Sequence, residues 1–188
     1  MLNYTCDLSN NDNCTSLPKT IVIVNCVINT PLMLISIIGN ALVLAAILRT
    51  PSLRSPSTIF LCNLATSDLL VGIVVQPFSI VSELKPESSL LQHAYNMLSL
   101  FCCGVSLGTM AAISVDRYLA IHYHMRYPNL MTKKRALCTS GALWSMCLLL
   151  TCLYFMSRNI YLVTAVVGIA ICISVTTFSY ISIYRIVL

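Results

Sequence analysis

Charged residues are scarce in this sequence. Only 9% of its 188 residues are charged and six are acidic, whereas 57% are hydrophobic and the mean hydropathy is +0.85. Soluble domains carry about a quarter of their residues as charged side chains, so this composition excludes an ordinary soluble domain. The chain also lacks metalloprotease spacing, a nucleophile elbow and a phosphate-binding loop. We therefore expect a membrane protein that is not an enzyme and has no cofactor.

Internal repeats and a cleavable signal sequence are also lacking. Residues 1–19 are polar and have no basic start followed by a short apolar core, so the first apolar segment is expected to act as the targeting signal and to remain in the protein. Corresponding paired segments in two halves, which would indicate a transporter, are not found.

Long apolar runs are what the sequence does contain. A hydrocarbon core of roughly 30 Å requires about 20 helical residues, and five runs reach that length, at about 20–48, 57–82, 90–122, 136–157 and 160–188. They are continuous and show no period of two, which favours helices over barrel strands. We predict an all-α membrane protein in which an extracellular segment, 1–19, precedes one helical bundle, 20–188.

Basic residues indicate the orientation, because Lys and Arg accumulate in cytoplasmic loops. With the N-terminus outside, only Lys19, Lys85 and Arg158 are extracellular. The cytoplasmic side then holds eight bases: Arg49, Arg54, Arg117, Arg126, Lys133, Lys134, Arg135 and Arg185. The excess of basic residues that gives the net charge of +5 thus fits cytoplasmic loops in contact with anionic membrane lipid. Because these bases flank membrane spans, nucleic acid is not expected as a partner.

The N-terminal segment carries candidate modification sites. Asn3 and Asn13 each begin an Asn-X-Thr sequon and would be glycosylated if this segment is extracellular. Cys6 and Cys14 would meet an oxidising compartment there, where they could pair with each other or with another loop.

Polar residues within the apolar spans are expensive and usually functional. At 1.5 Å per residue, Asn40, Asp68, Ser106 and Trp144 lie roughly 12–16 Å from the ends of their spans, in one layer. A carboxylate at this depth needs a cation, a proton or several dipoles. Asn40, Asp68 and Ser106 therefore form either a small-cation site, with sodium as the candidate metal, or a satisfied packing network.

These residues belong to four motifs. "GNALV" (39–43), "NLATSDLL" (63–70), "DRYLAI" (116–121) and Trp144 resemble, in order and spacing, the rhodopsin-like (class A) G-protein-coupled receptors. The resemblance extends from about residue 25 to the end, and the pattern is most similar to the melanocortin, lysophospholipid, cannabinoid and adenosine receptors. It implies five helices of a seven-helix receptor in the plasma membrane.

The resemblance also implies a switch for a heterotrimeric G protein. Asp116, Arg117 and Tyr118 match the family's motif, in which the aspartate holds the arginine until activation. Met125 occupies the place of an apolar residue that enters the G protein, and Tyr184 resembles the tyrosine that receives the freed arginine.

Departures from the family pattern narrow the range of ligands that we expect. Gln92 stands where most members have a disulfide-bonded cysteine, and Thr176 replaces the usual proline of the fifth span. Ser99 replaces the aspartate of amine receptors, so the extracellular ligand is not expected to be a biogenic amine. The candidate ligand-pocket residues are Gln92, Asn96, Ser99 and Cys103.

The sequence ends within an apolar helical pattern, at "YISIYRIVL". The sixth and seventh helices of the family are expected to be missing from this chain. Two interpretations remain: a fragment of a signalling receptor, or a truncated, non-signalling isoform that associates with full-length receptors. Small or polar residues such as Gly104, Gly108, Ser174 and Ser179 are expected on faces open to such partners.

Overall fold

Five helical spans form the body of the molecule. The computed structural model describes residues 3–6, 14–17, 19–50, 55–84, 88–156 and 158–187. The spans are α1 (Lys19–Arg49), the continuous unit α2 (Pro56–Leu70), η2 (Val71–Val75) and α3 (Gln76–Leu84), then α4 (Ser89–His122), α6 (Lys133–Met156) and α7 (Arg158–Val187). All five are long and apolar enough to cross a membrane, which confirms the predicted fold class.

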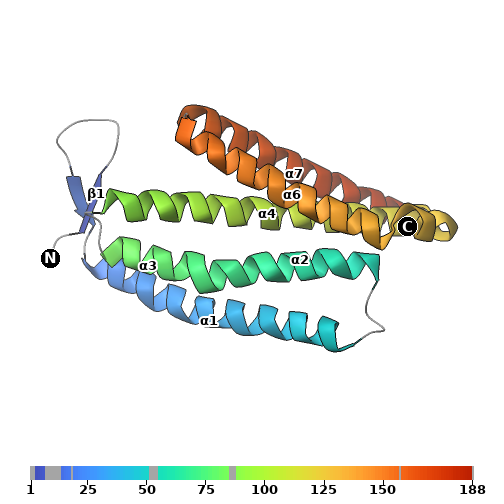
Figure 1. The fold of residues 1–188 in the computed structure, drawn as a ribbon, viewed down its shortest axis with the longest axis horizontal. Coiled ribbons are helices and arrows are strands. Elements are labelled where there is room, and N and C mark those ends of the chain that lie inside the picture. Colours follow the sequence, from blue (N-terminus) through green and yellow to red (C-terminus); the bar gives the residue numbers. More distant parts are fainter. Residues whose placement is uncertain are drawn as a thin grey trace.

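Helix α4 lies at the centre of the bundle. It packs against α2 on one side and against α6 and α7 on the other, while α1 packs along α2. Figure 1 shows α1 and α7 on opposite sides of the molecule and the two termini at opposite ends. The odd number of spans accounts for this separation.

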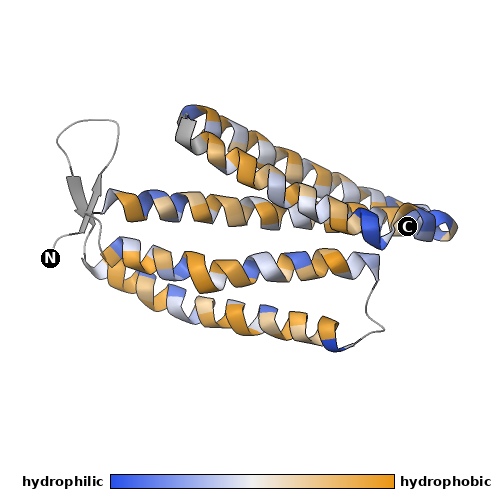
Figure 2. Ribbon diagram, viewed as in Figure 1, coloured by the Kyte–Doolittle hydropathy of each residue, from blue (hydrophilic) through white to orange (hydrophobic). Residues whose placement is uncertain are grey.

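Two short elements follow α4 and connect it to α6. They are the 3-10 turn η3 (His124–Arg126) and the one-turn helix α5 (Tyr127–Leu130). Hydrophilic residues gather at this end, near the start of α6 and the end of α1 (Figure 2). We call it the basic end, defined by Arg49, Arg117, Arg126, Lys133 and Arg135.

The N-terminal segment contains a hairpin that the sequence analysis did not predict. Strands β1 (Asn3–Cys6) and β2 (Cys14–Leu17) are antiparallel, with Asn3 opposite Leu17 and Cys6 opposite Cys14. Asn13, the second sequon residue, lies outside the described residues.

Local sequence explains where the second span begins and why it deforms. Ser55 caps α2, since its hydroxyl accepts from the Thr58 N–H at 3.3 Å, and Pro56 follows in the first turn, where its missing N–H costs nothing. Pro77 lies in the interior of the span, where its ring would clash with the carbonyl of Ile73. The π-turn η2 lies there, and the Gln76 N–H reaches back to the Val71 carbonyl.

The buried residues are mostly small or polar and lie largely on α2 and α4. They include Phe60, Ala65, Ser67, Cys102, Val105, Thr109 and Ser114. Large aliphatic side chains on α1 and α7 are instead exposed, such as Ile35 and Val166. This distribution suits a bundle surrounded by hydrocarbon rather than by water.

Close helix contacts depend on glycine. A Cβ on Gly72 would lie 2.8 Å from Ile37 Cγ1 of α1, and one on Gly108 would lie 3.0 Å from Leu143 of α6. A Cβ on Gly104 would approach the Cys147 sulfur to 3.2 Å. Gly104 and Gly108 therefore do not face outward as expected, because α6 covers them. Ser179 is also buried, and only Ser174 of that predicted set is exposed.

Candidate functional site

Asp116 and Arg117, adjacent at the basic end of α4, have opposite environments. Asp116 is only 1% exposed, whereas Arg117 is exposed. The Tyr127 hydroxyl donates a 2.7 Å hydrogen bond to Asp116 Oδ1, and it lies 2.9 Å from the Ser57 hydroxyl. Because the single phenolic proton goes to Asp116, Ser57 donates to Tyr127. One chain of hydrogen bonds thus joins α2, α4 and α5.

This arrangement differs from the expected restraint of Arg117 by Asp116. In the described part of the chain, the structure records no ion pair between the two side chains, and the observed partner of Asp116 is Tyr127. A buried carboxylate needs a donor, and the phenol supplies it without a second charge. Arg117 is consequently available at the surface.

The other predicted switch residues occupy the same end but remain separate. Met125 is 90% exposed in η3, and Tyr184 is 66% exposed near the end of α7. The Tyr118 ring stacks on His122, with centroids 5.4 Å apart. Among the described residues no hydrogen bond joins Tyr184 to Arg117.

The ionisation of Tyr127 follows from this environment. Burial is the main cause that raises the pKa of its phenol, and the hydrogen bond to Asp116 raises the pKa further. The Ser57 hydrogen bond and the charge of Arg117 act in the opposite direction. Tyr127 is therefore held as a neutral donor.

Asp68 and Ser106 are brought together between α2 and α4, where both are partly buried, as the sequence suggested. The Ser106 hydroxyl donates to Asp68 Oδ1 at 3.1 Å and lies 2.9 Å from the Ser67 hydroxyl. Asn40 is placed differently. Its amide donates to the Ser36 carbonyl of its own helix at 2.9 Å, and Ser36 in turn donates to the backbone carbonyl of Asp68.

The oxygen atoms around Asp68 fit a small hard cation in part. A carboxylate and a serine hydroxyl are suitable oxygen ligands, whereas the Asn40 side chain is hydrogen-bonded to its own helix. Among the described residues no cluster of three or more His, Cys, Asp or Glu side chains could hold a metal. Any cation would thus depend on Asp68 and neighbouring hydroxyls.

Trp144 joins a second polar junction rather than the Asp68 layer. Its indole N–H donates to Asn63 Oδ1, and the Asn63 amide donates to Thr109 at 2.7 Å. Phe101 packs edge-on against the Trp144 ring, with centroids 5.7 Å apart. Asn63 thus connects α2, α4 and α6. It was not singled out as a site residue, although a polar side chain inside an apolar span was the available signal.

The proposed ligand residues lie along α4 toward its N-terminal end. Gln92, Asn96, Ser99 and Cys103 are spaced by three or four residues and share one face of the helix. Gln92 and Cys103 are exposed, and Asn96 and Ser99 are partly buried. This face is polar toward the N-terminal end of α4, and Cys103 is its last member.

Comparison with known proteins identifies the family. The sequence profile of the 7 transmembrane receptor (rhodopsin family) matches residues 39–187. The chain belongs to this family. As a rhodopsin-family chain it is a receptor-type membrane protein and not an enzyme, as predicted.

The relatives of this rhodopsin-family chain include octopamine, melanocortin and adrenergic receptors. It is 37% identical to octopamine receptor 1 of Lymnaea stagnalis, over 64% of this chain and 19% of the relative. It is 35% identical to melanocortin receptor 4 of Danio rerio, over 61% and 38%. The alpha-1A adrenergic receptor of Bos taurus is 30% identical, over 76% and 32%. The matches therefore span well under half the length of these receptors.

Proposed function

We propose that this chain carries the G-protein-coupling surface of a receptor, with Arg117 as the central contact. The supporting observation is the hydrogen bond from Tyr127 to Asp116, with Arg117 exposed and Met125 exposed at the same end of the bundle. A guanidinium offers five fixed donors, which suit carboxylate or backbone carbonyl acceptors on a partner. An exposed methionine adds an adaptable apolar contact.

Coupling needs an element with two states that bind the partner differently. The family resemblance assigns that role to a sixth helix, which is not among residues 1–188. We infer that residues 1–188 alone do not activate a G protein. They supply the fixed part of the surface, held by the Tyr127–Asp116 bond.

The test expresses residues 1–188 in receptor-free membranes and measures nucleotide exchange on added G protein. The measurement is repeated after co-expression of the sixth and seventh helices of a related receptor, with assembly verified by co-purification. We expect exchange only in the assembled complex, lost in Arg117→Ala and kept in Lys133→Ala. Exchange by residues 1–188 alone, or exchange that survives Arg117→Ala, would contradict the proposal. So would a lack of exchange by the purified assembly.

We further propose that the basic end faces the cytoplasm and that the protein resides in the plasma membrane with its N-terminus outside. The Arg and Lys residues that define that end support this orientation. Epitope tags at the two termini, probed on intact cells, test it. An accessible C-terminal tag with a hidden N-terminal tag would reverse the assignment.

A ligand other than a biogenic amine is proposed for the outer end. In support, α4 carries a single carboxylate, Asp116, and that group lies at the basic end. A cationic ligand would find the neutral Gln92, Asn96 and Ser99 on this helix. The octopamine and adrenergic names belong to relatives that match over part of their length, so they do not decide the ligand here.

Association with a full-length receptor is the second candidate function. It is favoured by the exposed aromatic side chains of α7, Phe178, Tyr180 and Tyr184. Co-expression with a tagged melanocortin receptor tests it. Lower surface expression of that receptor, reversed when the three residues are replaced by leucine, is the expected result.

A further inference from the structure

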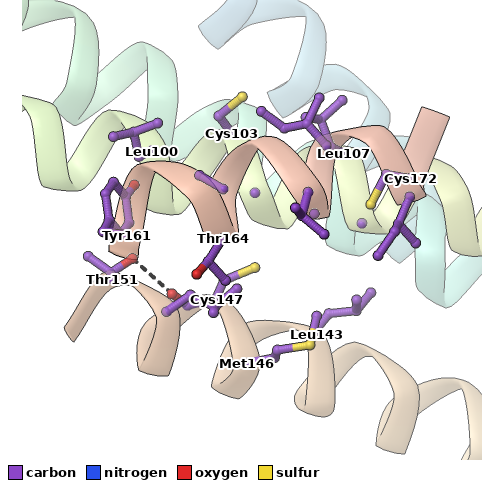
Figure 3. Close-up of a pocket in the computed structure, with 18 residues that line it drawn as sticks. Leu100, Cys103, Leu107, Leu143, Met146, Cys147, Thr151, Tyr161, Thr164 and Cys172 are labelled. Atoms are coloured by element: carbon purple, nitrogen blue, oxygen red, sulfur yellow. Dashed lines mark hydrogen bonds between the residues drawn. The ribbon is translucent and has the colours of Figure 1, made fainter. Parts of the chain in front are cut away.

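A cavity of about 440 Å³ lies between α4, α6 and α7 (Figure 3). In the close-up, Tyr161 and Thr151 lie at one end, and Cys172 and Leu143 lie at the other. Its walls include glycine on two helices, Gly104 and Gly108 on α4 and Gly168 on α7. A Cβ added to Gly168 would meet no atom within 4 Å, so this position borders open space.

The cavity offers no ionic group and few polar ones. None of its lining residues is charged. The Thr151 hydroxyl donates to the Cys147 carbonyl at 2.8 Å, and the Thr164 hydroxyl donates to the Ile160 carbonyl at 2.7 Å. Both threonines thus turn their donors back to their own helices, and Tyr161 is 4% exposed. A polar ligand would lose its hydration without gaining partners.

The dimensions of the cavity indicate the shape of an occupant. Its α7 wall runs from Tyr161 to Cys172, about 16 Å of helix, so the cavity is elongated. A single extended hydrocarbon chain can follow an apolar space of this length.

The position of the cavity supplies the source of such a chain. All three walls belong to segments long and apolar enough to span the membrane, so the surrounding medium is lipid hydrocarbon. We propose that the cavity binds an acyl chain of a membrane lipid and that this chain stabilises the packing of α7 against α4 and α6. The inference rests on membrane insertion and does not require coupling to a G protein.

The first experiment uses a phosphatidylcholine whose palmitoyl chain carries a photoreactive diazirine. Residues 1–188 are reconstituted with a trace of this lipid in dioleoyl-phosphatidylcholine vesicles, irradiated and analysed by peptide mass spectrometry. Adducts on the exposed face of α1, which meets bulk lipid, provide the internal reference. We expect adducts on the cavity residues of α6 and α7 to exceed that reference.

Two matched glycine variants test the site. Gly168→Leu places a side chain in the cavity, and we expect cavity adducts to fall about tenfold, because the filled volume excludes the chain. Gly141→Leu on α6 also enters open space but does not line the cavity, so it should leave the labelling unchanged. Equal labelling of wild type and Gly168→Leu, or cavity labelling no greater than that of α1, would overturn the proposal.

A second measurement detects the expected stabilisation. In delipidated micelles, palmitic acid should raise the unfolding midpoint of wild type and of Gly141→Leu but not of Gly168→Leu. If Gly168→Leu fails to fold, Ala165→Leu fills the same wall and replaces it in both experiments. A midpoint that does not respond to palmitic acid in wild type would also contradict the inference.

Discussion

The Tyr127 hydroxyl donates a 2.7 Å hydrogen bond to the buried carboxylate of Asp116. The bond connects the short helix that follows α4 to the last turns of α4 itself. The partner of the carboxylate is therefore a neutral phenol, and the neighbouring arginine is left exposed.

Replacing Tyr127 with phenylalanine should destabilise the basic end. The change leaves Asp116 buried without its donor, which costs about 1–3 kcal/mol of unfolding free energy. Equilibrium unfolding in mixed micelles measures the loss. Tyr123→Phe is the matched control, since Tyr123 is exposed, and should change the free energy by less than about 0.5 kcal/mol. Equal effects of the two variants would show that the phenol of Tyr127 contributes nothing.

Stability should also fall at alkaline pH because of the same residue. The pKa of Tyr127 is raised in the folded state above the ordinary value of 10.0, so folding favours the neutral phenol. Its contribution is complete below pH 10.0 and is lost as the pH rises through the folded-state pKa. Unfolding midpoints measured across this range should decline less steeply for Tyr127→Phe. Parallel curves would contradict the prediction.

Asn63→Ala should disturb the junction of α2, α4 and α6. It removes the acceptor of Trp144 and the donor to Thr109, with an expected cost of about 1–2 kcal/mol. Trp144 is the single tryptophan, so its fluorescence emission should shift in this variant. Asn129→Ala, at an exposed position, should leave the emission unchanged. The cost of Asn63→Ala should be smaller in a Trp144→Phe background, because the hydrogen bond between Trp144 and Asn63 is already absent there.

Gly72→Ala should weaken the contact between the first two spans. Its new methyl group would lie 2.8 Å from Ile37 Cγ1, and the resulting overpacking should cost about 1–3 kcal/mol. Gly39→Ala on α1 meets no atom within 4 Å and should be neutral or stabilising by up to about 1 kcal/mol. The same micelle unfolding experiment compares them. If Gly39→Ala were destabilised as much as Gly72→Ala, the loss could not be attributed to overpacking against Ile37.

Asp68→Asn tests whether the interior carboxylate binds sodium in an assembled receptor. The substitution keeps the volume and removes the charge, so agonist affinity should lose its dependence on sodium concentration while surface expression persists. Thr66→Ala is the control, since the exposed Thr66 hydroxyl donates to the Cys62 carbonyl of its own helix. An unchanged sodium response in Asp68→Asn would favour a packing network without an ion.

Depth along the spans could be predicted from the sequence, because a helix rises by a fixed 1.5 Å per residue. The five spans and the meeting of Asp68 with Ser106 follow from such counting. Rotation about the helix axis could not be predicted in the same way. Trp144 faces Asn63, 81 positions away, rather than the Asp68 layer, and the Asn40 amide turns to its own helix.

The partner of Asp116 could not be predicted for a related reason. Its position beside Arg117 in the sequence suggested an ion pair, but the carboxylate is buried and its observed donor comes from α5. Tyr127 occurs in the stretch "MRYPN" and was available as a donor. Only the geometry of that short connection brings its hydroxyl to the carboxylate.

The π-turn η2 changes how the second span aligns with its counterparts. It adds about one residue to a turn, which rotates everything beyond it by about 100° relative to an uninterrupted helix. Phe78 and the rest of α3 therefore point in directions that ordinary helical counting from Asp68 does not give. Deleting one residue within Val71–Val75 would leave α2 in place and turn α3, the last third of the span, to a different set of neighbours. A gap-free sequence alignment through this segment consequently equates positions that differ in orientation wherever a relative lacks the extra residue.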